Sequence, residues 1–163
     1  MRKRRPTIRI DKWLVALNLE DTKRVQRDVE APAYMCECEL CALWKSNYKT
    51  VLPRDYLHQL ARACIDLDYP TELYESSNDI NHLYVRIQFH IVGELLEGPI
   101  SYSRNEVGRN MYYSEVQKSP WVSVALTNHS EAYDYHPEYK DSISGKIILV
   151  DMRLALPNMA KNA

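Results

Sequence analysis

The stretch HLYVRIQFHIVGEL, residues 82–95, decides the fold class. Its apolar and polar residues alternate, so every second side chain points to the same face, which is the period of a β-strand. One face carries Leu83, Val85, Ile87, Phe89 and Ile91, and the other carries Tyr84, Arg86, Gln88 and His90. We therefore predict a long strand that turns one face toward the core.

Further strands are predicted on both sides of this stretch. Residues 7–11 (TIRID) alternate as a half-buried strand does, and residues 12–19 could extend that strand after a bend. After residue 70 the period stays near two. Strands are expected over residues 71–75 (TELYE), 121–127 (WVSVALT) and 145–156 (GKIILVDMRLAL), with a short one over 111–116.

Helices are predicted mainly in the first half of the chain. Residues 38–49 lack Gly and Pro and repeat apolar side chains at helical spacing, and residues 20–30 are charged enough for a short exposed helix or loop. A further helix follows Pro53, with one buried stripe expected at Leu57, Leu60, Ala61 and Cys64.

These elements together predict the α+β class, because strands and helices alternate too little for a doubly wound parallel sheet. We expect a single domain over residues 7–157, with its helices packed on a mainly antiparallel sheet. A basic arm over residues 1–6 precedes the domain and a tail over residues 158–163 follows it.

Composition excludes several classes of function. The chain has 21 Lys+Arg and 22 Asp+Glu, and this near-balance gives no general attraction to nucleic acid or to anionic membranes. No apolar run is long enough to cross a bilayer, and the basic start has no apolar segment behind it as a secretory signal would. Glycine-rich phosphate loops are absent. We expect a cytoplasmic protein without nucleic-acid or membrane partners.

A cluster of cysteines is the most distinctive local feature. Cys36, Cys38 and Cys41 form a CxCxxC pattern, and zinc is commonly bound by four sulfur or nitrogen ligands. If a helix begins near Cys38, these three thiols lie on one side of its start. A structural zinc would then take its fourth ligand from Cys64 or His58, both on the next predicted helix.

Two other interpretations of the thiols stay open. A CxxC at the start of a helix suits disulfide exchange, but Glu37 and Glu39 flank the thiols and should raise their pKa. The remaining interpretation, which we favour from the sequence, is that the thiols are buried or half-buried structural side chains without a ligand. No cofactor is then required.

The segment MCECELCALW, residues 35–44, resembles a largely uncharacterised group of small bacterial proteins. The group shares a Cys-x-Cys-x-x-Cys motif, a leucine-proline helix (here from Leu52-Pro53) and a His-Leu-Tyr strand (here residues 82–84). Its final strand is similar to residues 146–156, which close at Pro157. This chain has Glu37 and Leu40 where the group has Gly and Tyr, and Asn158 where it has Trp. The resemblance implies a fold and no activity.

Aromatic composition favours protein binding. Twelve Tyr and three Trp against one Phe are side chains that can anchor an interface with a ring and a polar tip. We hypothesise a non-catalytic protein-binding domain, most concretely a bacterial immunity-type protein that caps the active site of a cognate toxin. Its acidic and aromatic loop suits a basic cleft. The predicted contact residues are Tyr133, Asp134, Tyr135, Glu138 and Tyr139.

The alternative is a zinc-stabilised domain or a thiol-dependent enzyme built on Cys36, Cys38 and Cys41. Enzymatic function receives no support from the common catalytic motifs, because the sequence contains no GxSxG, HExxH or EF-hand loop. We therefore predict no catalytic residue.

Overall fold

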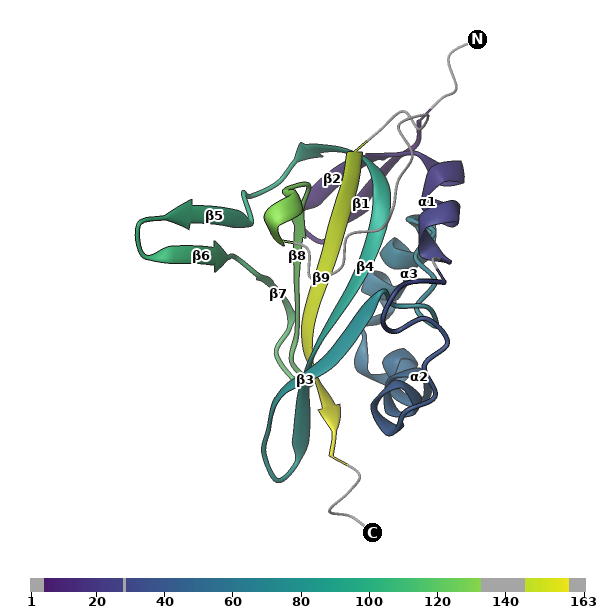
Figure 1. Ribbon diagram of the computed structural model, residues 1–163, viewed down its shortest axis with the longest axis vertical. Helices are drawn as coiled ribbons and strands as arrows, with labels where there is room; N and C mark the ends of the chain where they lie inside the picture. Colours follow the sequence, from purple (N-terminus) through teal and green to yellow (C-terminus); the bar gives the residue numbers. More distant parts are fainter. Residues whose placement is uncertain (1–4, 28, 133–145, 159–163) are drawn as a thin grey trace.

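Strand β4 (His82–Glu97) is the longest element and lies in the middle of a seven-stranded sheet (Figure 1). The computed structural model describes residues 5–27, 29–132 and 146–158. The strand order is β1-β2-β4-β9-β8-β7, with β3 also paired to β4, and all these pairings are antiparallel. The predicted α+β fold with a mainly antiparallel sheet is confirmed.

The elements follow one another along the chain as the sequence patterns predict in outline. Their bounds are β1 (Thr7–Ile10), β2 (Trp13–Leu17), α1 (Leu19–Gln26), α2 (Glu39–Val51), α3 (Arg54–Arg62), β3 (Glu72–Asn78), β4, β5 (Tyr102–Asn105), β6 (Gly108–Met111), β7 (Ser114–Gln117), β8 (Val122–Thr127), the short 3-10 helix η1 (Ser130–Ala132) and β9 (Lys146–Pro157). Among the residues described, no helix combines the length and the apolar character needed to cross a membrane.

The alternation along β4 sorts its side chains as predicted. Val85, Ile87 and Phe89 are fully buried in the main core, where they meet apolar side chains of β9 across the register. The other face is polar, but solvent does not reach its middle, because Gln88 and His90 are also fully buried. Arg86, further along the same face, keeps partial access to solvent.

One edge of β4 is shared by two strands and a helix. β3 pairs with residues 83–88 and β2 with residues 93–97, which leaves a gap between them. Helix α1 fills the gap: Gln26 Nε2 donates to the carbonyl oxygen of His90 at 2.6 Å, and Val92 N donates to Thr22 Oγ1 at 2.9 Å. The prediction that residues 20–30 are exposed is therefore wrong for this side of α1. Its side chains bond the backbone groups of β4 that have no neighbouring strand in the gap.

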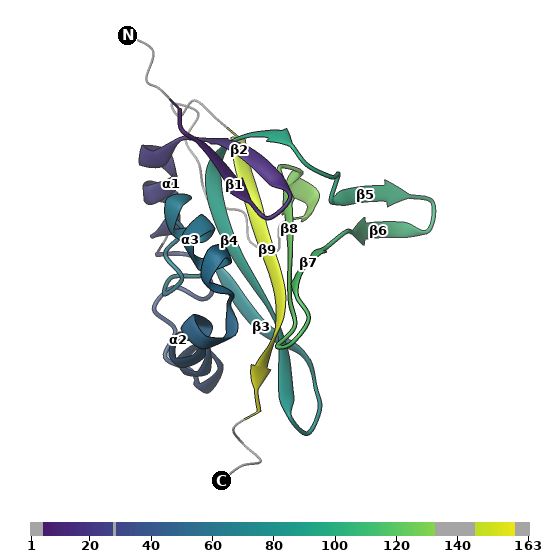
Figure 2. The ribbon, with the colours of Figure 1, turned by 180° about the vertical axis from the view of Figure 1, so that it is seen from behind.

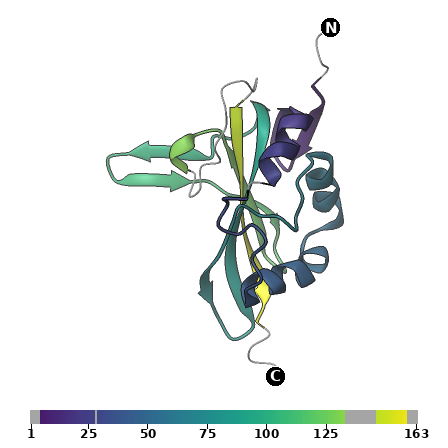
Figure 3. The ribbon, with the colours of Figure 1, turned by 45° about the vertical axis from the view of Figure 1, so that its right-hand side comes forward.

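Helices α2 and α3 cover the core face of the sheet, and α1 lies beside α3 in the same layer (Figures 2 and 3). Trp44 of α2 is fully buried and its Nε1 donates to the carbonyl oxygen of Leu67 at 2.7 Å. On α3 the fully or nearly fully buried side chains are Tyr56 and Leu60, and Ala63 follows at the same spacing.

The stripe predicted for α3 is correct at Leu60 and wrong for its neighbours. Leu57 and Cys64 are half-buried and Ala61 is exposed, so the helix is rotated by about one residue relative to the expectation. The reason is that two apolar stripes compete on this helix, and the one that carries the ring of Tyr56 takes the core because it buries more apolar area.

Strands β5 and β6 form a separate two-stranded arm that projects away from the sheet (Figures 1 and 2). The arm pairs Tyr102 with Met111 at its base and turns between Asn105 and Gly108. The strand expected over residues 111–116 is divided in the structure between the end of β6 and the start of β7.

Candidate metal centre

The three clustered cysteines meet at the N-terminus of α2. The Sγ atoms of Cys36, Cys38 and Cys41 all lie within 4.8 Å of one another, and all three thiols are free of disulfide bonds. Six residues of extended backbone cannot bring the three thiols this close, so the arrangement depends on the helix start. The predicted helix that begins near Cys38 is confirmed, with Cys38 as its N-cap.

Local backbone conformation explains how the thiols converge. Cys36 N donates to the carbonyl oxygen of Ala33 at 3.3 Å, which closes a turn, and Met35 has a positive φ of 52°. At the helix start, the Sγ of Cys38 accepts from the backbone N–H of Cys41 at 3.4 Å, in the place of the usual oxygen cap. The turn and the cap together bring residues 36, 38 and 41 to one side.

The three thiols differ in exposure and in acidity. Cys38 is exposed, and its hydrogen bonds from the backbone of Cys41 and from Cys36 lower its pKa. Burial raises the pKa of the Cys41 thiol well above its ordinary value. The expectation that Glu37 and Glu39 raise the thiol pKa is therefore wrong for Cys38, because the N–H groups at the helix start outweigh the two exposed carboxylates.

The two residues predicted as fourth ligand lie outside this cluster. Cys64 follows the end of α3, is half-buried, and faces a groove between the helices. His58 is exposed on the surface of α3. In the part of the chain that the structure describes, no fourth Cys, His, Asp or Glu ligand atom joins the group of three.

Three thiols at a helix N-terminus can hold one soft metal ion. Thiolate is a preferred ligand of zinc, and the positive end of the helix dipole stabilises the thiolate form. A zinc site with three protein ligands keeps a fourth position for water or another ligand. Cys38 is exposed, so solvent reaches the cluster on that side.

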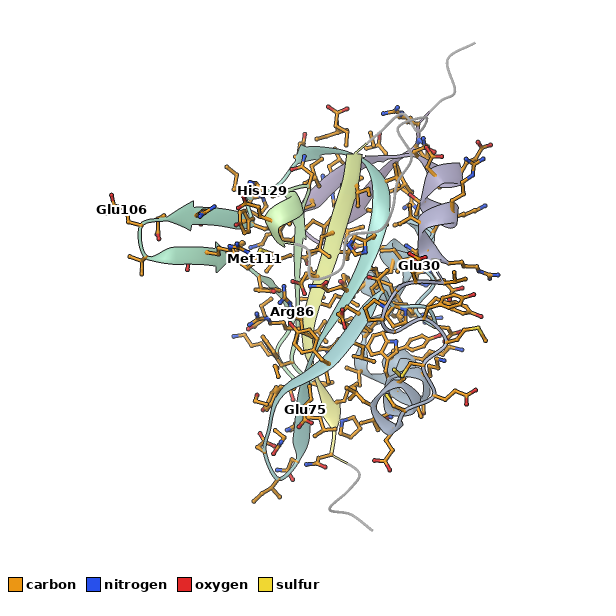
Figure 4. The ribbon with its side chains drawn as sticks, viewed as in Figure 1. Glu30, Glu75, Arg86, Glu106, Met111 and His129 are labelled. Carbon is orange, nitrogen blue, oxygen red and sulfur yellow. The ribbon has the colours of Figure 1, made fainter. Side chains whose placement is uncertain are left out.

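The residues predicted to contact a protein partner, namely Tyr133, Asp134, Tyr135, Glu138 and Tyr139, all lie outside the described residues. The chain just before them is anchored to the arm. The hydroxyl of Tyr102 donates to Glu131 at 3.0 Å and lowers the pKa of that carboxyl, and its ring packs 4.4 Å from the ring of His129. Figure 4 shows His129 near the base of the arm and Glu106 at its tip.

A buried charge network on the sheet face that points away from the helices was not predicted from the sequence. Arg86 donates to both carboxylate oxygens of Asp151, with Nη2 to Oδ2 at 2.6 Å, and Tyr113 donates to the same oxygen at 2.8 Å (Figure 4 labels Arg86). Burial alone would lower the pKa of Arg86, but the hydrogen bonds and charge of Asp151 raise it. The signal was present: Asp151 is the only charged residue in the apolar run IILVDM, and a carboxylate there needs a partner.

Comparison of the chain with protein-family models, with curated proteins and with solved structures gives no match.

Proposed function

We propose that the protein binds one zinc ion through the thiolates of Cys36, Cys38 and Cys41. The observation that carries the proposal is the mutual approach of the three Sγ atoms to within 4.8 Å, without a disulfide. Unbound thiolates at this separation repel one another, and a divalent cation removes the repulsion while it releases the thiol protons.

The metal would fasten the loop before α2 to the helix itself. Two contacts join that loop to the segment before β3. Ala33 N donates to the carbonyl oxygen of Thr71 at 3.2 Å, and the ring of Tyr34 stacks on Tyr69 at 5.8 Å. A zinc ion bound by one loop thiol and two helix thiols would add three strong bonds at this point. The role supported best is therefore that of a zinc-stabilised domain.

The test uses the protein purified without chelator, with its zinc content measured by mass spectrometry and by release to a colorimetric indicator. We expect one zinc per chain in the parent protein and less than a tenth of that in Cys38→Ser. Serine is a better N-cap than cysteine, so this variant keeps the helix start and its metal loss is not a folding effect.

Cys64→Ser is the matched control, because it removes a half-buried thiol outside the cluster. We expect Cys64→Ser to keep its zinc. At free zinc a hundredfold above the dissociation constant, the metal should stabilise the parent by about 2.7 kcal/mol and leave Cys38→Ser unchanged. A parent protein without zinc affinity, or equal losses in the two variants, would overturn the proposal.

We also propose that the protein binds a protein partner, as an immunity-type protein binds its toxin, and the arm favours this second candidate. Val107 at the turn is 95% exposed, Ile100 is 86% exposed and Tyr112 is 44% exposed. A two-stranded hairpin with exposed apolar side chains is marginal in water and is typical of a segment that docks on another molecule.

A photo-crosslinking amino acid at position 107 tests this second candidate in the host cell, with one at exposed Lys45 of α2 as the control. We expect a discrete crosslinked protein from position 107 that disappears when Tyr112→Ser is added. No adduct at position 107, or the same adducts from both positions, would count against the arm as a partner-binding element.

A further inference from the structure

A groove of about 680 Å³ lies in the helix layer between α1 and α3, separate from the thiol cluster. Helices α1 and α3 run beside each other (Figures 2 and 3). The walls come from both helices, from the loop after α3, and from Tyr48 of α2, whose hydroxyl donates to Asp68. The side chains that decide its chemistry are Lys23, Arg27, Leu57, Ala61, Cys64 and Ile65.

One wall of the groove is apolar and comes from α3 and the residues just after it. Leu57 and Ala61 lie one turn apart on α3, and Cys64 follows the end of the helix; all three line the groove, and Leu57 also packs against the edge of the main core. Below them Ile65 is only 5% exposed and forms an apolar floor. An open apolar wall of this kind is typical of a surface that a ligand covers.

The opposite wall carries positive charge. Arg27, the C-cap of α1, approaches Asp66 at 3.9 Å, a weak contact between exposed side chains, and its guanidinium lies over the ring of Tyr69 at 5.2 Å. Lys23, one turn earlier on α1, forms no ion pair with the residues that the structure describes. Two cations against one carboxylate leave the groove with a net positive charge beside its apolar wall.

We propose that this groove binds a small organic anion with an apolar body, such as an aromatic or short acyl carboxylate or sulfonate. The body would lie against Leu57 and Ile65, and the anionic group would lie near Lys23 and Arg27. The volume is within the range of about 300–1,000 Å³ that small-molecule sites occupy. Charge and shape complement that class of ligand, and the site does not depend on the metal.

The probe is 8-anilino-1-naphthalenesulfonate, which combines a fused aromatic body with a sulfonate and fluoresces when its body leaves water. We expect saturable binding of one molecule per chain under conditions where the near-ultraviolet circular dichroism stays native. Ala61→Trp fills the groove from an exposed helix position and should weaken binding at least tenfold. Arg62→Trp adds the same ring at the next exposed position, outside the groove, and should leave the affinity within twofold.

Two further readouts locate the bound probe. Lys23→Gln should weaken binding severalfold, and the effect should shrink as salt is raised. The alkylation rate of Cys64, followed on its own peptide by mass spectrometry, should fall at least fivefold when the probe is saturating. Unsaturable binding, equal affinity of the two Trp variants, or an unprotected Cys64 would each overturn the proposal.

Discussion

The buried pair of Arg86 and Asp151 gives the sharpest test of the energetics of the sheet. Asp151→Asn keeps the shape of the side chain and removes its charge. The carboxylate is fully buried and accepts three hydrogen bonds from Arg86 and one from Tyr113. The substitution would remove the carboxylate charge that pairs with the guanidinium of Arg86, a side chain that is only 14% exposed.

The size of the loss follows from how little water reaches the pair. Removal of one partner of a buried ion pair costs about 3–5 kcal/mol, because the remaining charge stays desolvated. Arg86 keeps a small exposed fraction, so we expect the lower end, about 3 kcal/mol of unfolding free energy. For a chain of 163 residues this corresponds to a fall in Tm of roughly 6–12 °C.

Urea unfolding followed by tryptophan fluorescence measures the change, with the slope of the transition checked for two-state behaviour. The control is the double variant Arg86→Met with Asp151→Leu, which removes both charges and should recover most of the loss. A loss below 1 kcal/mol for Asp151→Asn, or a double variant as unstable as the sum of its single changes, would refute the reasoning.

Three further predictions test single positions. Cys64→Gly should raise the unfolding free energy by about 1 kcal/mol in urea titrations, because Cys64 has a φ of 58°, which a residue with a side chain adopts at a cost; a lower stability would contradict this. Gly93→Ala should lower the unfolding free energy by about 3 kcal/mol, and with it the Tm, because the added Cβ would clash with a backbone oxygen of β2; an unchanged melting curve would disprove the β2–β4 register. In the metal-free protein, the alkylation rate of Cys38 should rise with pH around a midpoint below the ordinary thiol pKa of 9.0, while Cys41 stays unmodified at that pH. Peptide mass spectrometry follows the two thiols separately, and equal midpoints would count against the capped geometry.

Much of the sheet could be predicted because its signal is local. The alternation over residues 82–95 predicts a strand and its core face, the apolar run over residues 145–156 predicts a second strand, and the structure pairs the two from residues 82 to 93 of β4. The helix start at Cys38 is also local, since it depends on a cap and on the absence of Gly and Pro after it. Elements of this kind keep their identity in any fold that contains them.

The role of α1 could not be predicted, because it depends on a gap that other strands leave. Nothing in the pattern of residues 20–30 says that β2 and β3 occupy the same edge of β4 without meeting. Only then do Thr22 and Gln26 become buried substitutes for strand partners. A charged helix and a gap-filling helix have the same local sequence requirements, so tertiary context decides between them.

The thiol cluster shows the same division between local and distant information. The approach of Cys36, Cys38 and Cys41 follows from six residues of backbone, and the sequence anticipates it. The fourth ligand expected at Cys64 or His58 required the next helix to turn a particular face toward α2. That face depends on the rotation of α3, and the single stripe predicted at Leu57, Leu60, Ala61 and Cys64 gave this rotation incorrectly.

The rotation of α3 is also what creates the groove. Tyr56 and Leu57 are neighbours, and each could have led a stripe into the core. The ring of Tyr56 packs against the sheet, where its hydroxyl contacts Met152 Sδ at 3.0 Å. With Tyr56 in this position, Leu57 and Ala61 line the groove beside α1. An apolar stripe in a sequence predicts only that one side of a helix is shielded from water. Here the core takes the stripe with the larger side chain, and the residues beside that stripe line a ligand-sized groove whose opposite side carries Lys23 and Arg27.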